Sequence, residues 1–372
     1  MKPIDKREMQ HKTSNNYQPI AIDVFSGSGG LTVGLKKSGF NVVGAVEIEP
    51  HAFATYKANH PEVQAYKQDI RTIKGKSLLA LSPNGTVDLL SGCPPCQGFS
   101  TLTSRYKRLD PRNNLMLEMS RLVEEIQPKM VMMENVPGLP TKGAALFKQF
   151  LDTLDSLGYI TEWGVLQVAD YGIPQSRQRF VLLSGKGFPI HLPKATHSRI
   201  GKDGLTLWKT LRDAIGFMPE PMILANTQSQ GGPQQYNWHV VRSLSPQTLN
   251  ILKAARPGES RVKLPNELRP PCHQNRKDGF NNVYGRMSWD QVASTITSGC
   301  TTVSKGRFGH PDSDRTISVR EAALLQTFPM EYIFDTPYID PVCEMIGNAL
   351  PCEFAEVLAQ QCLNALRKFG DP

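Results

Sequence analysis

The sequence lacks any long apolar run, since none of its hydrophobic stretches approaches the roughly 18 residues that a membrane-spanning helix requires. Residues 1–18 are polar and charged, without the apolar core of a secretory signal, and we expect a polar tail there. No internal repeat or low-complexity segment is visible. From these absences we expect neither a membrane span nor a repeat architecture, and no secretory signal in residues 1–18. The 372 residues suffice for one large globular domain or two ordinary ones.

Cysteines are few and widely scattered. Their odd count and irregular spacing indicate a reducing compartment, so we expect a cytoplasmic protein. Only Cys93 and Cys96 stand close together, and a zinc site would need a second pair of ligands, so no metal site is predicted. A thioredoxin-like redox function for this pair stays an alternative. The full set is Cys93, Cys96, Cys272, Cys300, Cys343, Cys352 and Cys362.

Acidic residues are outnumbered, with 34 Asp and Glu against 42 Lys and Arg, which gives a formal net charge of +8 and a pI near 9.1. This balance fits a polyanionic partner but does not identify one. From about residue 189 the alternation of strand and helix patterns stops, and Gly, Pro, Gln, Asn and basic residues accumulate. We expect a second domain with a basic face there.

A nucleoside-cofactor signature opens the first domain. Residues 19–25 form an apolar strand pattern, a glycine-rich loop follows at residues 26–30, and a helix begins near Leu31. The next strand ends at Glu47, about 20 residues past the first glycine, where an acid can bind ribose hydroxyls. The glycine spacing departs from the dinucleotide pattern. A turn that serves only packing stays an alternative, as does a nucleotide-dependent oxidoreductase.

Three further stretches place reactive side chains at strand ends. The apolar run 87–90 is broken by Gly92 and two prolines, so the Cys96 thiol lies where ligands bind an open α/β sheet. A basic loop then runs to Asn114, which we interpret as a lid over a phosphate backbone, with an ordinary solvated loop as the alternative. Glu134 follows the strand at 129–133, and could equally be a solvent-facing acid. Polar side chains on one face enter the strand at 180–183 and need buried partners: Gln175, Arg177 and Arg179.

These stretches, taken together and in order, resemble the DNA (cytosine-5) methyltransferases of bacterial type. The resemblance extends over residues 21–366. It implies a doubly wound, Rossmann-like α/β domain that uses S-adenosylmethionine, with a smaller, irregular, β-rich target-recognition domain. The expected division is a tail at 1–18, a catalytic and cofactor-binding domain at 19–190, a target-recognition domain at 191–342 and a returning segment at 343–372. The matching motifs are Phe25-x-Gly-x-Gly-Gly, Pro-Cys-Gln-Gly-Phe-Ser at 95–100, Glu134-Asn135-Val136, Gln175-x-Arg177-x-Arg179, residues 315–329 and residues 347–351.

The resemblance implies methyl transfer from S-adenosyl-L-methionine to C5 of a flipped-out cytosine in a specific double-stranded DNA sequence, through a covalent bond from Cys96 to C6. The expected catalytic residues are Cys96, Glu134, Arg177 and Arg179. The expected cofactor-binding residues are Phe25, Ser26, Gly27, Gly29, Gly30, Leu31, Glu47, Ile48, Asp69, Ile70, Pro95 and Asn348. The expected DNA-binding residues are Gln97, Ser100, Arg105, Lys107, Arg108, Arg112, Gln175, Arg286 and Thr295.

Two alternatives within the family stay open. One is the branch that methylates tRNA, although its expected Cys-Phe-Thr tripeptide is absent here. The other is a non-catalytic DNA-binding relative, although every catalytic position is filled. We expect a monomer with no membrane partner, associated with the bacterial nucleoid through DNA, and a cognate restriction endonuclease that acts separately.

Overall fold

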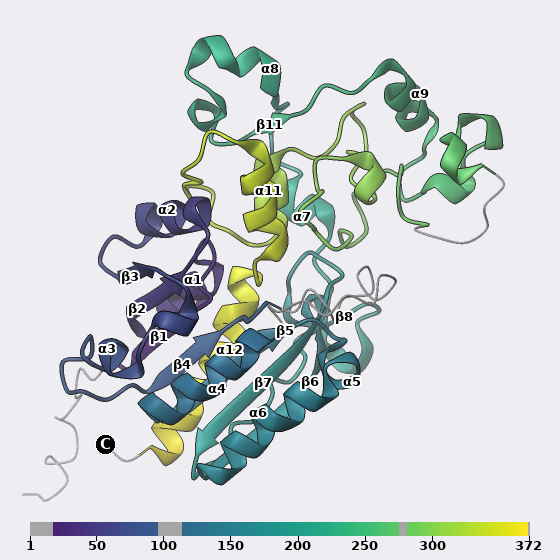
Figure 1. Ribbon diagram of the computed structural model, residues 1–372. Coiled ribbons are helices and arrows are strands. Elements are labelled where there is room, and N and C mark those ends of the chain that lie inside the picture. The colour runs from purple at the N-terminus through teal and green to yellow at the C-terminus, as the bar shows by residue number, and fades with distance from the viewer. Residues whose placement is uncertain (1–17, 96–113, 275–280, 371–372) are drawn as a thin grey trace, which may run out of the picture.

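The computed structural model describes residues 18–95, 114–274 and 281–370, which form two regions (Figure 1). The sheet domain comprises residues 18–193 together with the C-terminal helix α12 (Cys352–Phe369), and the irregular domain comprises residues 194–348. Within the described ranges, no helix is long and apolar enough to cross a membrane.

A seven-stranded sheet in the order β3-β2-β1-β4-β5-β7-β6 forms the centre of the sheet domain. Strands β1 to β5 run parallel to one another, whereas β7 runs antiparallel to both β5 and β6. The predicted Rossmann-like sheet is confirmed, but the reversal of β7 was not foreseen, because an apolar run does not reveal strand direction. The strands are β1 (Ile20–Val24), β2 (Asn41–Glu47), β3 (Gln64–Lys67), β4 (Leu89–Gly92), β5 (Met130–Asn135), β6 (Tyr159–Gln167) and β7 (Gln178–Lys186).

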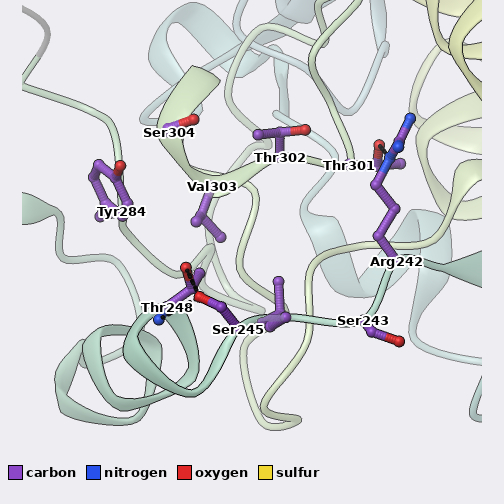
Figure 2. Close-up of a pocket in the computed structure, with 10 residues that line it drawn as sticks. Arg242, Ser243, Ser245, Thr248, Tyr284, Thr301, Thr302, Val303 and Ser304 are labelled. Atoms are coloured by element: carbon purple, nitrogen blue, oxygen red, sulfur yellow. Dashed lines mark hydrogen bonds between the residues drawn. The ribbon is translucent and has the colours of Figure 1, made fainter.

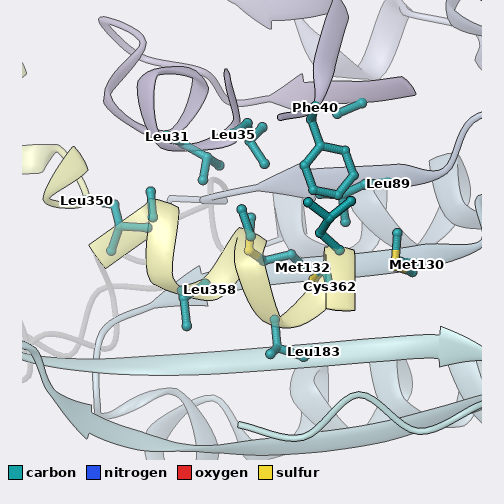
Figure 3. Packing of buried hydrophobic residues seen from close by; sticks show 14 of the residues in the cluster. Leu31, Leu35, Phe40, Leu89, Met130, Met132, Leu183, Leu350, Leu358 and Cys362 are labelled. Carbon is teal, nitrogen blue, oxygen red and sulfur yellow. The ribbon is translucent and has the colours of Figure 1, made fainter. Parts of the chain in front are cut away.

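Helices cover both faces of this sheet. One face packs against α3 (Gly75–Leu79), α4 (Leu115–Ile126) and α6 (Ala144–Ser156). The other face packs against α12 and α1 (Gly30–Ser38), which lie side by side on it (Figure 3). A side chain at Gly34 would come within 2.5 Å of the α12 backbone at Glu356, so this glycine permits the close approach of the two helices. The predicted return of the chain to the first domain is therefore made by α12.

The irregular domain contains only two-residue strands and short helices in its described part. The expectation of a β-rich domain is not met there, because more of the described residues lie in helices than in strands. Helix α11 crosses the expected boundary at residues 342–343 and packs into the core of the irregular domain. The elements are β8 (His197–Ser198), β9 (Thr206–Leu207), β10 (Met222–Ile223), β11 (Val240–Val241), α7 (Leu211–Ile215), α8 (Leu224–Thr227), α9 (Pro246–Ala254), α10 (Val319–Leu325) and α11 (Ile339–Asn348).

Two short elements complete the sheet domain and matter for the site. Helix α2 (Pro50–Asn59) connects β2 to β3 and lies beside α11, as Figure 1 shows. Helix α5 (Leu139–Lys142) follows β5 directly. Both lie at the edge of the sheet where β1, β2, β4 and β5 end, which is the edge where open α/β sheets bind ligands.

Candidate active site

The glycine loop after β1 takes a backbone shape that few residues tolerate. Phe25, Gly27 and Gly29 have φ angles of 58°, 54° and 95°. Phe25 also packs its ring against the core of the sheet domain. A Cβ added at Gly27 would meet nothing within 4 Å, so the loop opens onto free space at that residue. The loop thus brings bare backbone to the edge of the sheet, as close approach of a ligand requires.

Glu47 holds this loop in place from the end of β2. Its carboxylate accepts from the Gly27 amide at 2.8 Å and from the Ile48 and Glu49 amides at 2.9 and 2.7 Å. Burial raises the pKa of this carboxyl above its ordinary value. Ile48 beside it is 60% exposed. An acid beside an open glycine loop and an exposed apolar residue fits a nucleoside-type cofactor, with the acid near the ribose.

The remaining predicted cofactor residues have varied surroundings. Asp69 caps the turn η1 (Ile70–Thr72) and pairs with Arg71 at 2.5 Å, which lowers its pKa. Leu31 and Ile70 have buried side chains, so only their backbone could meet a ligand. Asn348 is exposed at the end of α11, and Pro95 is half-buried. Ser26 is buried and Gly30 begins α1.

Glu134 and Arg179 form an ion pair beside the cysteine loop. The Arg179 Nε lies 2.6 Å from the Glu134 carboxylate, and both side chains are largely buried. Strand pairing explains the contact, since β5 and the reversed β7 run side by side and bring the two residues together. Asn135 donates from its side chain to the Pro94 carbonyl at 3.1 Å, which ties β5 to the cysteine loop. The partly exposed Cys93 thiol faces Glu134, and burial together with that carboxylate raises its pKa.

The predicted nucleophile and lid lie outside the described residues. This applies to Cys96, Gln97, Ser100, Arg105, Lys107, Arg108 and Arg112. Their roles stay predictions. Strand β4 and Pro94 nevertheless bring the chain to the Glu134 side of the site immediately before Cys96.

Gln175 and Arg177 join the two domains and face away from solvent. The Gln175 side chain donates to Gln326 at 2.7 Å and accepts from the Ile296 amide at 2.9 Å. Arg177 donates to the carbonyls of Ile296 and Gly347 at 2.6 and 2.9 Å. Both side chains are at least 98% buried, so this structure gives them a positioning role, in place of the predicted DNA contact of Gln175 and the predicted catalytic contact of Arg177.

The predicted DNA contact of Arg286 needs the same correction. Its guanidinium is 5% exposed and donates to the carbonyls of Leu252, Ala255 and His310 at 2.9–3.0 Å, and it pairs with Asp314. It stabilises the interior of the irregular domain. Thr295 is exposed and donates to the Ser176 carbonyl at 2.6 Å, and its DNA contact stays a prediction.

Sequence reasoning missed two buried residues next to the glycine loop. Tyr332 of the irregular domain donates to the Ser28 carbonyl at 2.5 Å, and His60 lies 3.3 Å from the same hydroxyl. No local pattern links positions that are 304 residues apart, although Tyr332 lies close to the family-like stretch 315–329.

The sheet order, the open glycine loop and the acid that follows it are typical of Rossmann-like α/β enzymes that bind a nucleoside cofactor at the carboxyl edge of the sheet. Residues 20–364 match the family described as C-5 cytosine-specific DNA methylase. The chain belongs to this family of methyltransferases, as the sequence motifs predicted.

Relatives and solved structures agree with that assignment. The chain is 38% identical over 344 residues to the type II methylase M.HgiDII of Herpetosiphon aurantiacus, covering 91% of this chain and 93% of the relative. It is 34% identical over 347 residues to the type II methyltransferase M1.HphI of Haemophilus parahaemolyticus, covering 92% and 86%. A crystal structure of a putative prophage-encoded DNA modification methyltransferase from E. coli has the same fold, with a TM-score of 0.71, 22% identity and coverage of 94% of this chain and 99% of that one.

Proposed function

We propose that the protein transfers a methyl group from S-adenosylmethionine to C5 of cytosine in a specific double-stranded DNA sequence. The observation that carries this proposal is the buried Glu134–Arg179 pair, 2.6 Å apart, next to the loop that leads into Cys96. A carboxyl group paired with a guanidinium matches the N3 and O2 edge of a cytosine ring. The cofactor supplies an electrophilic methyl group.

The chain's own residues divide the work as follows. The Cys96 thiolate adds to C6, which makes C5 nucleophilic. Glu134 shares a proton with N3 as charge builds on the ring, and Arg179 holds O2 and keeps the carboxylate in place. The amides at the start of α1 would hold the methionine end of the cofactor, the Glu47 carboxylate its ribose and Asp69 its adenine. Loss of the C5 proton then expels Cys96.

A duplex with 5-fluorocytosine at the target position tests this mechanism, because fluorine cannot leave as a proton does. With S-adenosylmethionine present, the wild-type protein should stay covalently bonded to the DNA in a denaturing gel. Cys96→Ala should give no such band, and Glu134→Gln should form it at least tenfold more slowly. The absence of a band on DNA that the enzyme demonstrably methylates would eliminate Cys96 as the nucleophile. Sequencing 5-methylcytosine in cells that express the chain identifies the target.

We also propose that the irregular domain reads the DNA sequence, and that a hydroxyl-rich pocket of about 180 Å³ contributes (Figure 2). Figure 2 shows Ser243, Thr302 and Ser304 around it, with Arg242 at one end, where Thr301 lies 3.3 Å from its Nε. Hydroxyl groups and an arginine suit phosphate oxygens and base edges. Thr302→Val should weaken binding of the cognate duplex two- to tenfold, the range expected for one hydrogen bond. The exposed Thr206→Val serves as the matched control, and equal binding by both variants would exclude the pocket.

The type II relatives support a cognate restriction endonuclease that acts separately, and we propose a monomeric, cytoplasmic enzyme that meets the nucleoid through DNA. Size-exclusion chromatography with light scattering checks the monomer. The tRNA-methylating branch of the family stays the alternative, although its expected Cys-Phe-Thr tripeptide is absent here. Methylation assays on DNA and tRNA side by side separate the two substrates.

A further inference from the structure

A hydrogen-bonded chain of four residues runs beneath the glycine loop. The Lys36 ammonium lies 2.9 Å from His60 Nδ1, His60 Nε2 lies 3.3 Å from the Tyr332 hydroxyl, and that hydroxyl lies 2.5 Å from the Ser28 carbonyl. His60 and Tyr332 are 3% and 4% exposed, so solvent does not compete for the bonds that Tyr332 makes. The Lys36 ammonium is partly exposed and also pairs with Glu62. The bonds link Lys36 in α1 to His60, the residue that follows α2, then to Tyr332 of the irregular domain, and finally to Ser28 of the glycine loop.

The direction of these bonds follows from their chemistry. A lysine ammonium can only donate, so His60 Nδ1 accepts and the ring proton lies on Nε2. Burial, together with the positive charge of Lys36, lowers the pKa of His60 to about 4, so the ring is neutral at pH 7. His60 therefore donates to the Tyr332 oxygen, and the Tyr332 proton is directed to the Ser28 carbonyl.

The Ser28–Gly29 peptide is thereby fixed at both ends. Its carbonyl accepts from Tyr332, and its amide donates to the Ser26 carbonyl at 2.9 Å. Gly29 caps α1, and its own carbonyl accepts from Val33 at 2.9 Å. The orientation of this peptide therefore sets where the free amides of the first turn of α1 point.

The surroundings are built to keep Tyr332 in place. The Asn59 side chain donates to the Ile333 carbonyl at 2.7 Å and accepts from its amide at 3.0 Å. Thr55 accepts from the Asp335 amide at 2.9 Å, so the segment that carries Tyr332 is attached to α2 at three points. A Cβ at Gly29 would lie 2.7 Å from both His60 Nε2 and the Tyr332 hydroxyl, so only glycine allows this approach.

We infer that Lys36, His60 and Tyr332 are positioning residues that hold the glycine loop in the shape that binds the methyl donor, and that the irregular domain thereby contributes to cofactor affinity. This inference rests on the proposed use of S-adenosylmethionine. It predicts a loss of affinity for the cofactor and its product without a matching loss of turnover at saturation.

Calorimetric titration with S-adenosylhomocysteine tests the inference without any catalytic step. Tyr332→Phe should weaken binding about tenfold, or about 1.4 kcal/mol, and should raise KM for the donor similarly while kcat changes less than twofold. Tyr159→Phe is the matched control, because its hydroxyl also donates to a buried carbonyl at 2.5 Å, that of Pro128, at the opposite edge of the sheet. It should lower Tm comparably and leave the affinity unchanged.

Lys36→Met distinguishes a chain of bonds from a single bond. Without the ammonium, the His60 proton can move to Nδ1 and Tyr332 can donate to His60 instead of Ser28, so binding should weaken about threefold. Added to Tyr332→Phe, Lys36→Met should cost nothing further, because the chain is already broken. Additive losses, or wild-type affinity in Tyr332→Phe, would refute the inference. A wild-type protein that binds no S-adenosylhomocysteine would instead overturn the proposed cofactor.

Discussion

The sheet domain and the irregular domain satisfy their backbone polar groups in different ways. In the sheet domain, ladders between seven strands pair the amides and carbonyls of neighbouring segments. In the described part of the irregular domain, strands are only two residues long, and buried arginines donate to carbonyls of segments that no ladder joins. Arg320, for example, donates to the Asn237 and Tyr332 carbonyls at 2.8 Å each.

This difference determines how strongly the stability of each domain depends on any one side chain. A ladder distributes its bonds over many residues, so removing one side chain costs mainly packing. An arginine that collects several carbonyls concentrates them in one side chain, and its loss leaves each of those groups buried and unpaired. Single substitutions should therefore affect the irregular domain more sharply.

The largest effect should come from Arg286→Met. It removes the guanidinium donor of the Ala255 and His310 carbonyls and the ionic partner of the half-exposed Asp314, whereas the Leu252 and Ser313 carbonyls keep a backbone amide. We expect a loss of about 3–5 kcal/mol, since each buried carbonyl left unpaired costs about 1–3 kcal/mol. DNA binding should disappear, while S-adenosylhomocysteine binding by the sheet domain should be weakened far less. Chemical denaturation followed by calorimetry measures both. The exposed Arg199→Met should change neither, and an equally stable Arg286→Met would contradict the role assigned to Arg286.

The same contrast explains which features could be predicted from the sequence. Apolar patterns located four of the strands, since β1, β4, β5 and β7 overlap the runs expected at 19–25, 87–90, 129–133 and 180–183. Acids at strand ends gave Glu47 and Glu134, because a parallel sheet collects its carboxyl ends at one edge. Gln175 and Arg177 were expected to need buried partners, but those partners lie more than 100 residues away in the chain, and no local pattern specifies them.

The buried role of Arg286 and the contact of Tyr332 with the glycine loop were not predicted, for a related reason. Charged and polar residues are usually exposed, so a basic residue in a basic region is interpreted as a nucleic-acid contact. Only the tertiary arrangement shows that Arg286 is enclosed by carbonyls and that the Tyr332 hydroxyl reaches Ser28. Long-range partners of this kind are set by packing, which periodicity does not encode.

A smaller effect is expected in the sheet domain from Leu358→Ala. This fully buried side chain of α12 belongs to the core that α12, α1 and the sheet share (Figure 3). The cavity should cost about 3 kcal/mol, within the range for Leu→Ala in a core. Because the ladders remain, both ligand-binding activities should persist below the lowered Tm, which thermal denaturation measures with and without ligand. Loss of the fold at 25 °C would show that the strand ladders alone do not keep the sheet domain stable after this substitution.

The two domains also differ in how their buried charged residues are paired. Arg315 and Glu321 pair in the irregular domain at 2.9 Å. Asp23 of β1 is fully buried in the sheet domain with Thr32 as its hydrogen-bond donor, and no cation among the described residues pairs with it. Burial raises the pKa of Asp23 to about 7 from the ordinary value of 3.8. The folded state therefore binds more protons than the unfolded state between about pH 4 and pH 7, and stability falls as pH rises through that window.

Asp23→Asn should remove much of that decline. The pKa difference of about 3 units corresponds to at most about 4 kcal/mol, and we expect a gain of about 2 kcal/mol at pH 8, because the amide still accepts from Thr32. At pH 4 the two proteins should be nearly equal. Denaturation curves from pH 4 to pH 8 measure the slope, and an unchanged slope in the variant would assign the pH dependence to other groups.

The smallest effect is expected from Cys93→Ser, which tests the one thiol described at the active-site edge. Cys93 lies beside Glu134, and its raised pKa keeps it protonated, so it should not compete with Cys96 for C6 of the base. Two residues, Pro94 and Pro95, separate the two cysteines, a spacing that permits a disulfide. Serine keeps a donor toward Glu134, so turnover under reducing conditions should change less than twofold. Mild oxidation with diamide should slow the wild-type protein, dithiothreitol should restore it, and Cys93→Ser should not respond. The distant buried Cys362→Ser should respond as the wild type does. Oxidation that leaves wild-type turnover intact would show that the cysteine loop holds the two sulfurs too far apart to form a disulfide.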